Sequence, residues 1–151
     1  MLGSLQKDAR MLRELSYSDP FMALWNRRHF RKVLSGGLHR VQEKAGKGFG
    51  LAFIDVDCFK DINGTFGHAA GDMVLREFAK LAGEKLPDPA TFARLGGDEF
   101  VLLLPDADED ALFRRLEAIR EACTERLLVH ADRDVRFSIS VGGYRFTLSA
   151  L

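Results

Sequence analysis

Residues 94–100 (RLGGDEF) constrain the fold of this chain more than any other stretch, because they place a tight turn and two carboxylates inside an apolar segment. Ala93 precedes them and the apolar residues 101–104 follow. Gly-Gly and Gly-Asp are turn dipeptides that tolerate positive φ, and a two-residue loop gives the twist that paired strands need. The stretch therefore predicts a β-hairpin with Asp98 and Glu99 at its turn exit. Many hairpins have this composition, but two adjacent negative charges on a sheet edge favour a divalent cation.

Length and charge bound the class of protein. A chain of 151 residues predicts one domain with its own core, and 22 basic residues balance 22 acidic ones. This balance predicts no nucleic-acid partner and no membrane contact by this segment. No apolar run approaches the roughly 20 residues of a membrane span and no signal peptide is visible, so we expect a cytoplasmic protein. Cys58 and Cys123 lack metal or redox spacing and are expected to be reduced structural thiols.

Apolar periodicity predicts alternating helices and strands. Met11, Leu12 and Leu15 indicate a helix up to Ser16, which either packs on the domain or is the stub of a longer connecting helix. The other expected elements are a helix over 27–43 capped by Asn26, a buried strand over 49–56, a helix over 70–82, the hairpin, a helix over 108–126 with Leu112, Phe113, Leu116 and Ile119 inward, and a strand over 135–143. Helices interleaved with a hairpin predict a mixed α/β (α+β) sandwich.

The strand over 49–56 runs into residues 55–63 (DVDCFKDIN), which carry several polar groups. Unpaired buried charge is costly, so carboxylates at the end of a buried strand need a reason. If this strand lies beside the hairpin, Asp55 and Asp98 converge as hard oxygen ligands, which suit Mg²⁺ bridged to phosphate oxygens. Taken alone, a pair of solvated loop acids explains the pattern equally well.

Residues 67–72 (GHAAGD) lead into the helix over 70–82. Small residues let a ligand approach the backbone, and Asp72 near a helix start is favoured by the helix dipole. Alone, Asp72 is an ordinary N-terminal carboxylate. Together with Asn63, it gives an amide and a carboxylate that can read a guanine edge, the carboxylate accepting from N1–H and the 2-amino group.

These blocks, in this order, resemble the GGDEF family of diguanylate cyclases, which make cyclic di-GMP from two GTP. The resemblance runs from Asp19 to Tyr144 and rests on residues 19–30, 55–63, 67–72, 94–100 and 138–142. It implies a mostly antiparallel five-stranded sheet flanked by helices, of the nucleotidyl-cyclase type. It also implies a two-fold homodimer with one GTP per subunit, and an upstream sensor or signalling domain.

The resemblance also implies residue roles. Asp55, Asp98 and the Val56 carbonyl would bind Mg²⁺ (Mn²⁺ is possible), with Glu99 helping to hold a second metal. Asp98 would also be the catalytic base. Asn63 and Asp72 would bind guanine beside His68, and Lys60, with the backbone around Phe59, would stabilise phosphate charge.

Several positions depart from the family pattern. Phe21-Met22 replaces the usual Leu-Thr, and Gly64 stands where Asp commonly follows the Asn. The two positions of the family's inhibitory R-x-x-D motif hold Pro87 and Ala90, so we expect no such site in its usual form.

The C-terminal end departs as well. The family continues into a helix with a K-x-x-G-R-N motif, whereas here Arg145 is the nearby cation before Leu151. We therefore expect a connecting helix over 1–17 and a domain over 18–151 without that C-terminal helix. The leading hypothesis is a diguanylate cyclase; the alternatives are a non-catalytic module that binds GTP or a protein, and a cyclase that makes a monomeric cyclic nucleotide.

Overall fold

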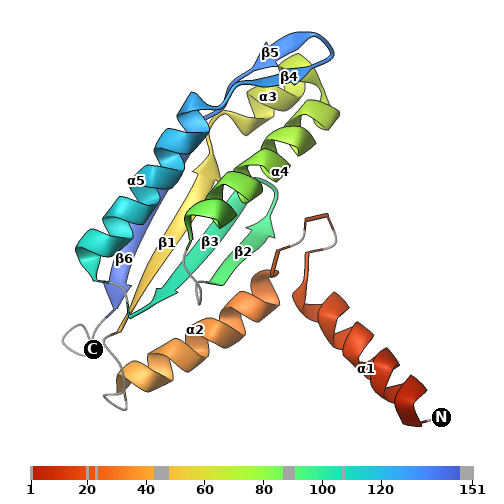
Figure 1. Ribbon diagram of the computed structural model, residues 1–151, viewed down its shortest axis with the longest axis vertical. Coiled ribbons are helices and arrows are strands. Elements are labelled where there is room, and N and C mark those ends of the chain that lie inside the picture. The colour runs from red at the N-terminus through yellow and green to blue at the C-terminus, as the bar shows by residue number, and fades with distance from the viewer. Residues whose placement is uncertain are drawn as a thin grey trace.

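The computed structural model describes residues 2–19, 21–22, 24–42, 48–86, 91–106 and 108–146. Its helices are α1 (Leu2–Tyr17), α2 (Arg27–Gln42), α3 (Phe59–Phe66), α4 (His68–Lys85) and α5 (Glu109–Glu125). Its strands are β1 (Phe49–Val56), β2 (Thr91–Gly96), β3 (Glu99–Pro105), β4 (Leu128–His130), β5 (Arg133–Val135) and β6 (Ile139–Phe146). Figure 1 shows one antiparallel sheet, of strand order β2-β3-β1-β6, with the short β4–β5 ladder beyond its end.

Strand β1 lies between β3 and β6, and its side chains alternate between two hydrophobic clusters, one on each face of the sheet. Ala52, Ile54 and Val56 face the larger cluster, which includes buried residues of α3, α4 and α5. Phe49 and Leu51 face the smaller cluster with α2. Because successive strand residues point to opposite faces, β1 is apolar on both sides and reads as a continuous hydrophobic run.

Helix α2 has a side-chain cap at its N-terminus and two glycines in its interior. Asn26 caps it: its Oδ1 accepts from the backbone N–H of His29 at 3.0 Å. Gly36 and Gly37 do not interrupt the helix, although glycine costs roughly 1 kcal/mol against alanine in a helix interior. A Cβ at Gly37 would lie 3.3 Å from the ring of Phe49, so this glycine lets α2 approach the sheet closely.

The expected fold class, an antiparallel sheet with flanking helices, is confirmed. The main sheet has four strands among the described residues instead of five; beyond β2 there is an isolated bridge from Trp25 to Ala93. The strand expected over 135–143 is two elements, because Val135 belongs to the ladder with β4 and β6 begins at Ile139. Helix α3 was not predicted; Ile62 is its only buried residue among those described.

Two side-chain expectations have opposite outcomes. Phe113 was placed inward but is 64% exposed, because it lies one position off the buried stripe of Leu112, Leu116, Ile119 and Cys123. Cys123 is a core residue, and burial raises the pKa of its thiol to about 11, as a structural thiol requires. Cys58 is free and exposed at the start of α3.

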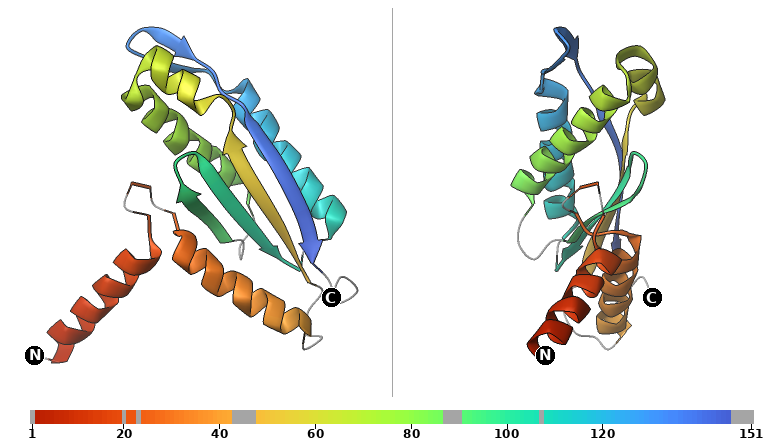
Figure 2. Two further views of the ribbon diagram at one scale, coloured as in Figure 1. Left: turned by 180° about the vertical axis from the view of Figure 1, so that it is seen from behind. Right: turned by 90° about the vertical axis from the view of Figure 1, so that its right-hand side faces the viewer.

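Helix α1 extends away from the sheet in all three views (Figures 1 and 2). Its exposed Leu5, Met11 and Leu12 are solvent-facing in the single chain. The division of the chain into a connecting helix over 1–17 and a domain over 18–151 stays a prediction. In the part of the chain that the structure describes, no helix is long and apolar enough to cross a membrane. Pro87 and Ala90 lie outside the described residues.

Phe100 should carry much of the core's stability. Its ring is fully buried and meets Phe78 edge to face at a centroid distance of 4.7 Å. We expect Phe100→Ala to lower the free energy of unfolding by about 3–5 kcal/mol in urea denaturation, through lost burial and an unfilled cavity. The exposed Phe113→Ala is the control, with an expected change within about 0.5 kcal/mol. Equal effects would contradict this description of the core.

Candidate functional site

The end of β1 and the turn between β2 and β3 lie side by side, as the sequence predicts. Asp55 is opposite Glu99 in the β1–β3 register. The backbone N–H of Val56 donates to the carbonyl of Asp98 at 3.3 Å. Gly96 and Gly97 have φ of 146° and 54°, so the turn uses the conformational freedom of both glycines. The structure thus brings four of the predicted site residues together: Asp55, Val56, Asp98 and Glu99.

The carboxylates of this cluster repel one another. Partial burial, then the negative charge of Asp98, then that of Glu99, raise the pKa of Asp55; a hydrogen bond with the Asp98 side chain and the charge of Asp57 act in the same direction. A cation would relieve this repulsion. In the described part of the chain, no three His, Cys, Asp or Glu side chains form a complete metal site. Two neighbouring carboxylates nevertheless fit Mg²⁺, because protein sites usually bind this ion through one or two carboxylates together with substrate phosphates.

Asp57 has a different role from Asp55. It accepts hydrogen bonds from Ser138 Oγ at 2.6 Å and Ser140 Oγ at 2.5 Å, and its backbone N–H donates to the Ser138 carbonyl. These contacts fasten the end of β1 to β6. Asp57 is therefore a structural residue that fixes the strand from which Asp55 projects.

A second group of predicted residues meets where α3 packs on α4. The Oδ1 atom of Asn63 is buried without a hydrogen-bond partner among the described residues. A Cβ at Gly71 would lie 1.8 Å from this atom and 3.2 Å from the Phe59 ring, so only glycine fits there. An unpaired buried acceptor costs stability, which indicates that Asn63 is held in place for a reason other than folding.

The remaining predicted residues flank these two groups. Asp72 follows Gly71 on α4 and is half-buried. Lys60 and His68 are exposed near the starts of α3 and α4, and no hydrogen bond or ion pair within the described ranges joins them to either group. Cys58, which precedes α3, has φ 52° and ψ 36°, a left-handed conformation that is uncommon without glycine. The turn from β1 into α3 is therefore locally strained.

Sequence reasoning missed the part played by Arg94. Its Nε and Nη2 donate to the carbonyl of Gly97 at 3.0 and 2.9 Å, next to Asp98. Its Nη1 lies 3.3 Å from Asp19 Oδ2. A basic residue two positions before the Gly-Gly turn was a signal that could have suggested a buttress for the turn.

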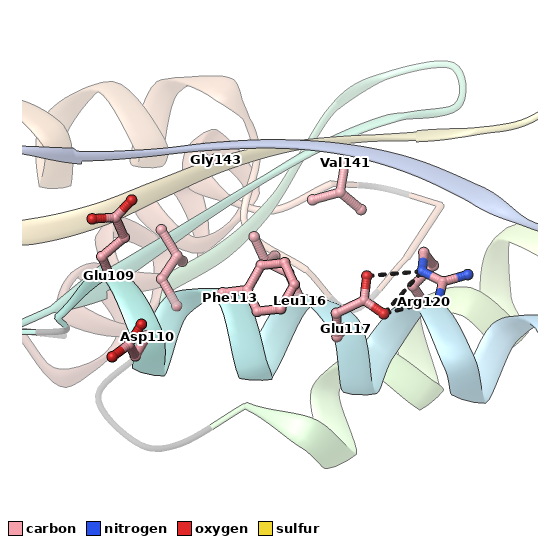
Figure 3. Close-up of a pocket in the computed structure, with 9 residues that line it drawn as sticks. Glu109, Asp110, Phe113, Leu116, Glu117, Arg120, Val141 and Gly143 are labelled. Atoms are coloured by element: carbon pink, nitrogen blue, oxygen red, sulfur yellow. Dashed lines mark hydrogen bonds and ion pairs between the residues drawn. The ribbon is translucent and has the colours of Figure 1, made fainter.

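Two hollows adjoin the sheet. One, of about 420 Å³, includes Asp55 and Glu99 in its lining, with Phe53, Leu95 and Gly142 beside them. The other, of about 360 Å³, lies between α5 and β6 and contains none of the predicted site residues. Figure 3 shows Phe113, Leu116 and Val141 at this second hollow, with the Glu117–Arg120 ion pair at its rim. Of the predicted site residues, Asp55 and Glu99 therefore line the first hollow and none lines the second.

Comparison with known proteins identifies the family of this chain. The family model described as "Diguanylate cyclase, GGDEF domain" matches residues 16–149, so the chain belongs to the GGDEF family. It is 31% identical to Diguanylate cyclase A of Treponema denticola over 99% of this chain and 41% of that protein. It is 43% identical to the probable diguanylate cyclase DgcE of Escherichia coli over 74% of this chain and 10% of that protein. The chain thus spans less than half the length of these relatives.

Solved structures show the same fold. The coiled-coil and GGDEF domain of DgcB from Caulobacter crescentus, in complex with c-di-GMP, superposes with a TM-score of 0.89 at 26% identity, covering 98% of this chain and 78% of that one. The diguanylate cyclase SiaD from Pseudomonas aeruginosa, in complex with its activator SiaC, gives a TM-score of 0.84 at 32% identity, covering 97% and 56%. The family and its fold are therefore established for this chain.

Removing the charge of Asp55 should stabilise the metal-free protein. Because the folded-state pKa of Asp55 is raised above its unfolded value, its contribution to stability is greatest below the unfolded pKa and is lost as pH rises through the folded pKa. Asp55→Asn should therefore raise the melting temperature at pH 7 in EDTA, with the gain shrinking below about pH 4. Thermal melts across pH measure this. A lower melting temperature at pH 7 would contradict the described repulsion.

The contact between Gly71 and Asn63 gives a second prediction. Gly71→Ala must displace the Asn63 amide and press on Phe59, so we expect a loss of about 1–3 kcal/mol in urea unfolding. Gly64→Ala is the matched control, because it adds a methyl group to a helix where nothing lies within 4 Å. The control should gain about 0.5–1 kcal/mol. Similar shifts for both variants would refute the close approach of α3 and α4.

Proposed function

We propose that this domain is a diguanylate cyclase, which condenses two GTP into cyclic di-GMP with release of pyrophosphate. The observation that carries the proposal is the convergence of Asp55, at the end of β1, with Asp98 in the turn between β2 and β3, beside a hollow of about 420 Å³ that Asp55 and Glu99 line. Family membership supports it, since the matched relatives include named diguanylate cyclases. Each half-reaction joins the 3′-oxygen of one GTP to the α-phosphorus of another, breaking its bond to pyrophosphate.

Asp55, Asp98 and the Val56 carbonyl would hold Mg²⁺, or Mn²⁺ in its place, and Glu99 would help to hold a second ion. The fit is chemical: two mutually repelling carboxylates are hard oxygen donors. When bound, the ion supplies charge neutralisation for the phosphate oxygens. Asp98 would also act as the base that accepts the proton of the attacking 3′-hydroxyl.

Phosphate and base recognition would fall to α3 and α4. Lys60, with the backbone around Phe59, would stabilise negative charge on the phosphates. Asn63 and Asp72 would bind guanine, with His68 beside them. The buried and unpartnered Oδ1 of Asn63 supports this role, because it shows an amide held in one orientation despite a cost in stability.

The proposal extends to assembly. Because each domain would bind one GTP, the reaction needs two domains with their sites facing, as in a two-fold homodimer. The relatives are much longer than this chain, and SiaD is described with an activator, so we also propose control by an upstream sensor or signalling domain. Its GTP requirement fits a cytoplasmic location.

The proposal is tested by turnover in the full-length protein with Mg²⁺ and GTP. We expect cyclic di-GMP by mass spectrometry, and loss of more than about 100-fold in rate for Asp98→Asn, since a general base contributes about 10²–10⁴-fold. Glu121→Gln, an exposed change on α5, is the control and should retain the wild-type rate.

The outcomes separate the candidate functions. A linear or monomeric cyclic nucleotide as the only product would overturn the proposal. GTP binding by calorimetry without any product, at any Mg²⁺ or Mn²⁺ concentration, would overturn it in favour of a non-catalytic regulatory module. Asp98→Asn with undiminished turnover would remove Asp98 from its role as base.

A further inference from the structure

Asp19, which lies between α1 and α2, contacts Arg94 of the hairpin formed by β2 and β3, called the signature hairpin below. One carboxylate oxygen of Asp19 accepts from the backbone N–H groups of Phe21 and Met22, at 2.9 and 2.8 Å. The same side chain pairs with Arg94, whose exposed fraction is only 15%. Asp19 is therefore held by three contacts to its carboxylate, two of which fix the backbone of Phe21 and Met22.

The Phe21 ring meets guanidinium groups from two different elements. Arg76 of α4 lies over the ring with its Cζ 4.3 Å from the centroid, and Arg94 of β2 does so at 5.2 Å. Both distances are within the roughly 6 Å over which a cation is attracted to an aromatic face. A leucine, which the family usually has here, would pack but could not make these contacts.

Each of these two arginines adjoins one half of the candidate site. Arg76 stands one helical turn after Asp72, on the element that packs on Asn63. Arg94 donates two hydrogen bonds to the carbonyl of Gly97, immediately before Asp98. The Phe21 ring thus contacts a guanidinium group beside each half of the candidate site.

We propose that Phe21 is a positioning residue, which holds the signature hairpin and α4 at a fixed separation through its contacts with Arg94 and Arg76. This inference rests on the proposed function for its catalytic consequence, but the mechanical link is independent of turnover. Phe21 touches no substrate. It acts through Arg94 on the hairpin that carries Asp98, and through Arg76 on the helix that carries Asp72.

A purely space-filling role makes a different prediction. Phe21 is half-buried and packs against the larger core cluster, so it contributes apolar contact as well. If that were its only role, Phe21→Leu would preserve most of it and Phe21→Tyr would gain nothing. The positioning role requires an aromatic face, so Tyr should substitute and Leu should not.

The mechanical test is amide hydrogen exchange followed by NMR, with the amide of Val56, which donates to the Asp98 carbonyl, as the reporter. We expect Phe21→Leu to speed exchange at Val56 about threefold, and Phe21→Tyr to leave it near the wild-type rate. Phe113→Leu is the matched control, since the same change on the outer side of α5 should have no effect on Val56. Exchange at the buried Ile119 reports any global loss of stability.

Equal Val56 exchange in Phe21→Leu and wild type would overturn the proposal, as would a Phe21→Tyr variant that matches Phe21→Leu. If Phe21→Leu is too unstable, Arg76→Met is the second variant, because it keeps Phe21 and removes one guanidinium; it should also speed exchange at Val56. An unchanged rate there would again overturn the link.

Kinetics of the full-length protein test the catalytic consequence. We expect Phe21→Leu to lower kcat about threefold with KM for GTP within twofold, and Phe21→Tyr to restore kcat. A wild-type protein that makes no cyclic di-GMP would refute the proposed function alone, because the exchange experiment still decides the link. Altered exchange with unchanged kcat would refute the positioning role alone.

Discussion

The antiparallel pairing of β1 with β3 is the constraint on which the rest of the site depends. This pairing sets Asp55 opposite Glu99 and brings Val56 to the Asp98 carbonyl. Side chains alternate along a strand, so a slip of one residue would turn Asp55 to the opposite face. The slip is prevented by burial on both faces of the sheet, since Phe100, Val101, Leu102 and Leu103 are all fully buried. Packing therefore determines which carboxylates meet.

Three destabilising features lie near the same end of the sheet. Like charges raise the pKa of Asp55, the Oδ1 of Asn63 is buried without a partner among the described residues, and Cys58 adopts a left-handed conformation. Each costs folding free energy, and each lies between β1 and α4 or at the hairpin. Positive φ at non-glycine residues is not confined to Cys58, since Asp106, Ala131 and Asp132 also have it, at other places in the chain. The repulsion at Asp55 and the unpartnered Oδ1 of Asn63 involve polar side chains, and their occurrence at one end of the sheet is what a functional site produces.

Local signals predicted the elements well, and non-local contacts explain what they missed. The strand over 49–56 and the capping by Asn26 and Asp108 follow from nearby residues alone. Spacing could not decide between Asp55 and Asp57, because residues two apart in a strand share a face. The two residues are distinguished by Ser138 and Ser140, more than 80 positions further along the chain. Their hydroxyl groups donate hydrogen bonds to Asp57, which leaves Asp55 as the carboxylate beside the hairpin. Helix α3 carries Phe59, Ile62 and Phe66 at helical spacing, a local signal that sequence reasoning missed.

The two halves of the site are carried by different elements, so the signature turn alone cannot define an active centre. Asp98 depends on the hairpin, whereas Asn63 and Asp72 depend on α3 and α4. Deep in the domain these elements share a core in which Phe78 of α4 meets Phe100 of β3. Elsewhere they are bridged by Asp19 and Phe21, through their contacts with the two arginines. Asp19 stands two positions after the end of α1 at Tyr17, so this bridge lies where α1 joins the rest of the chain.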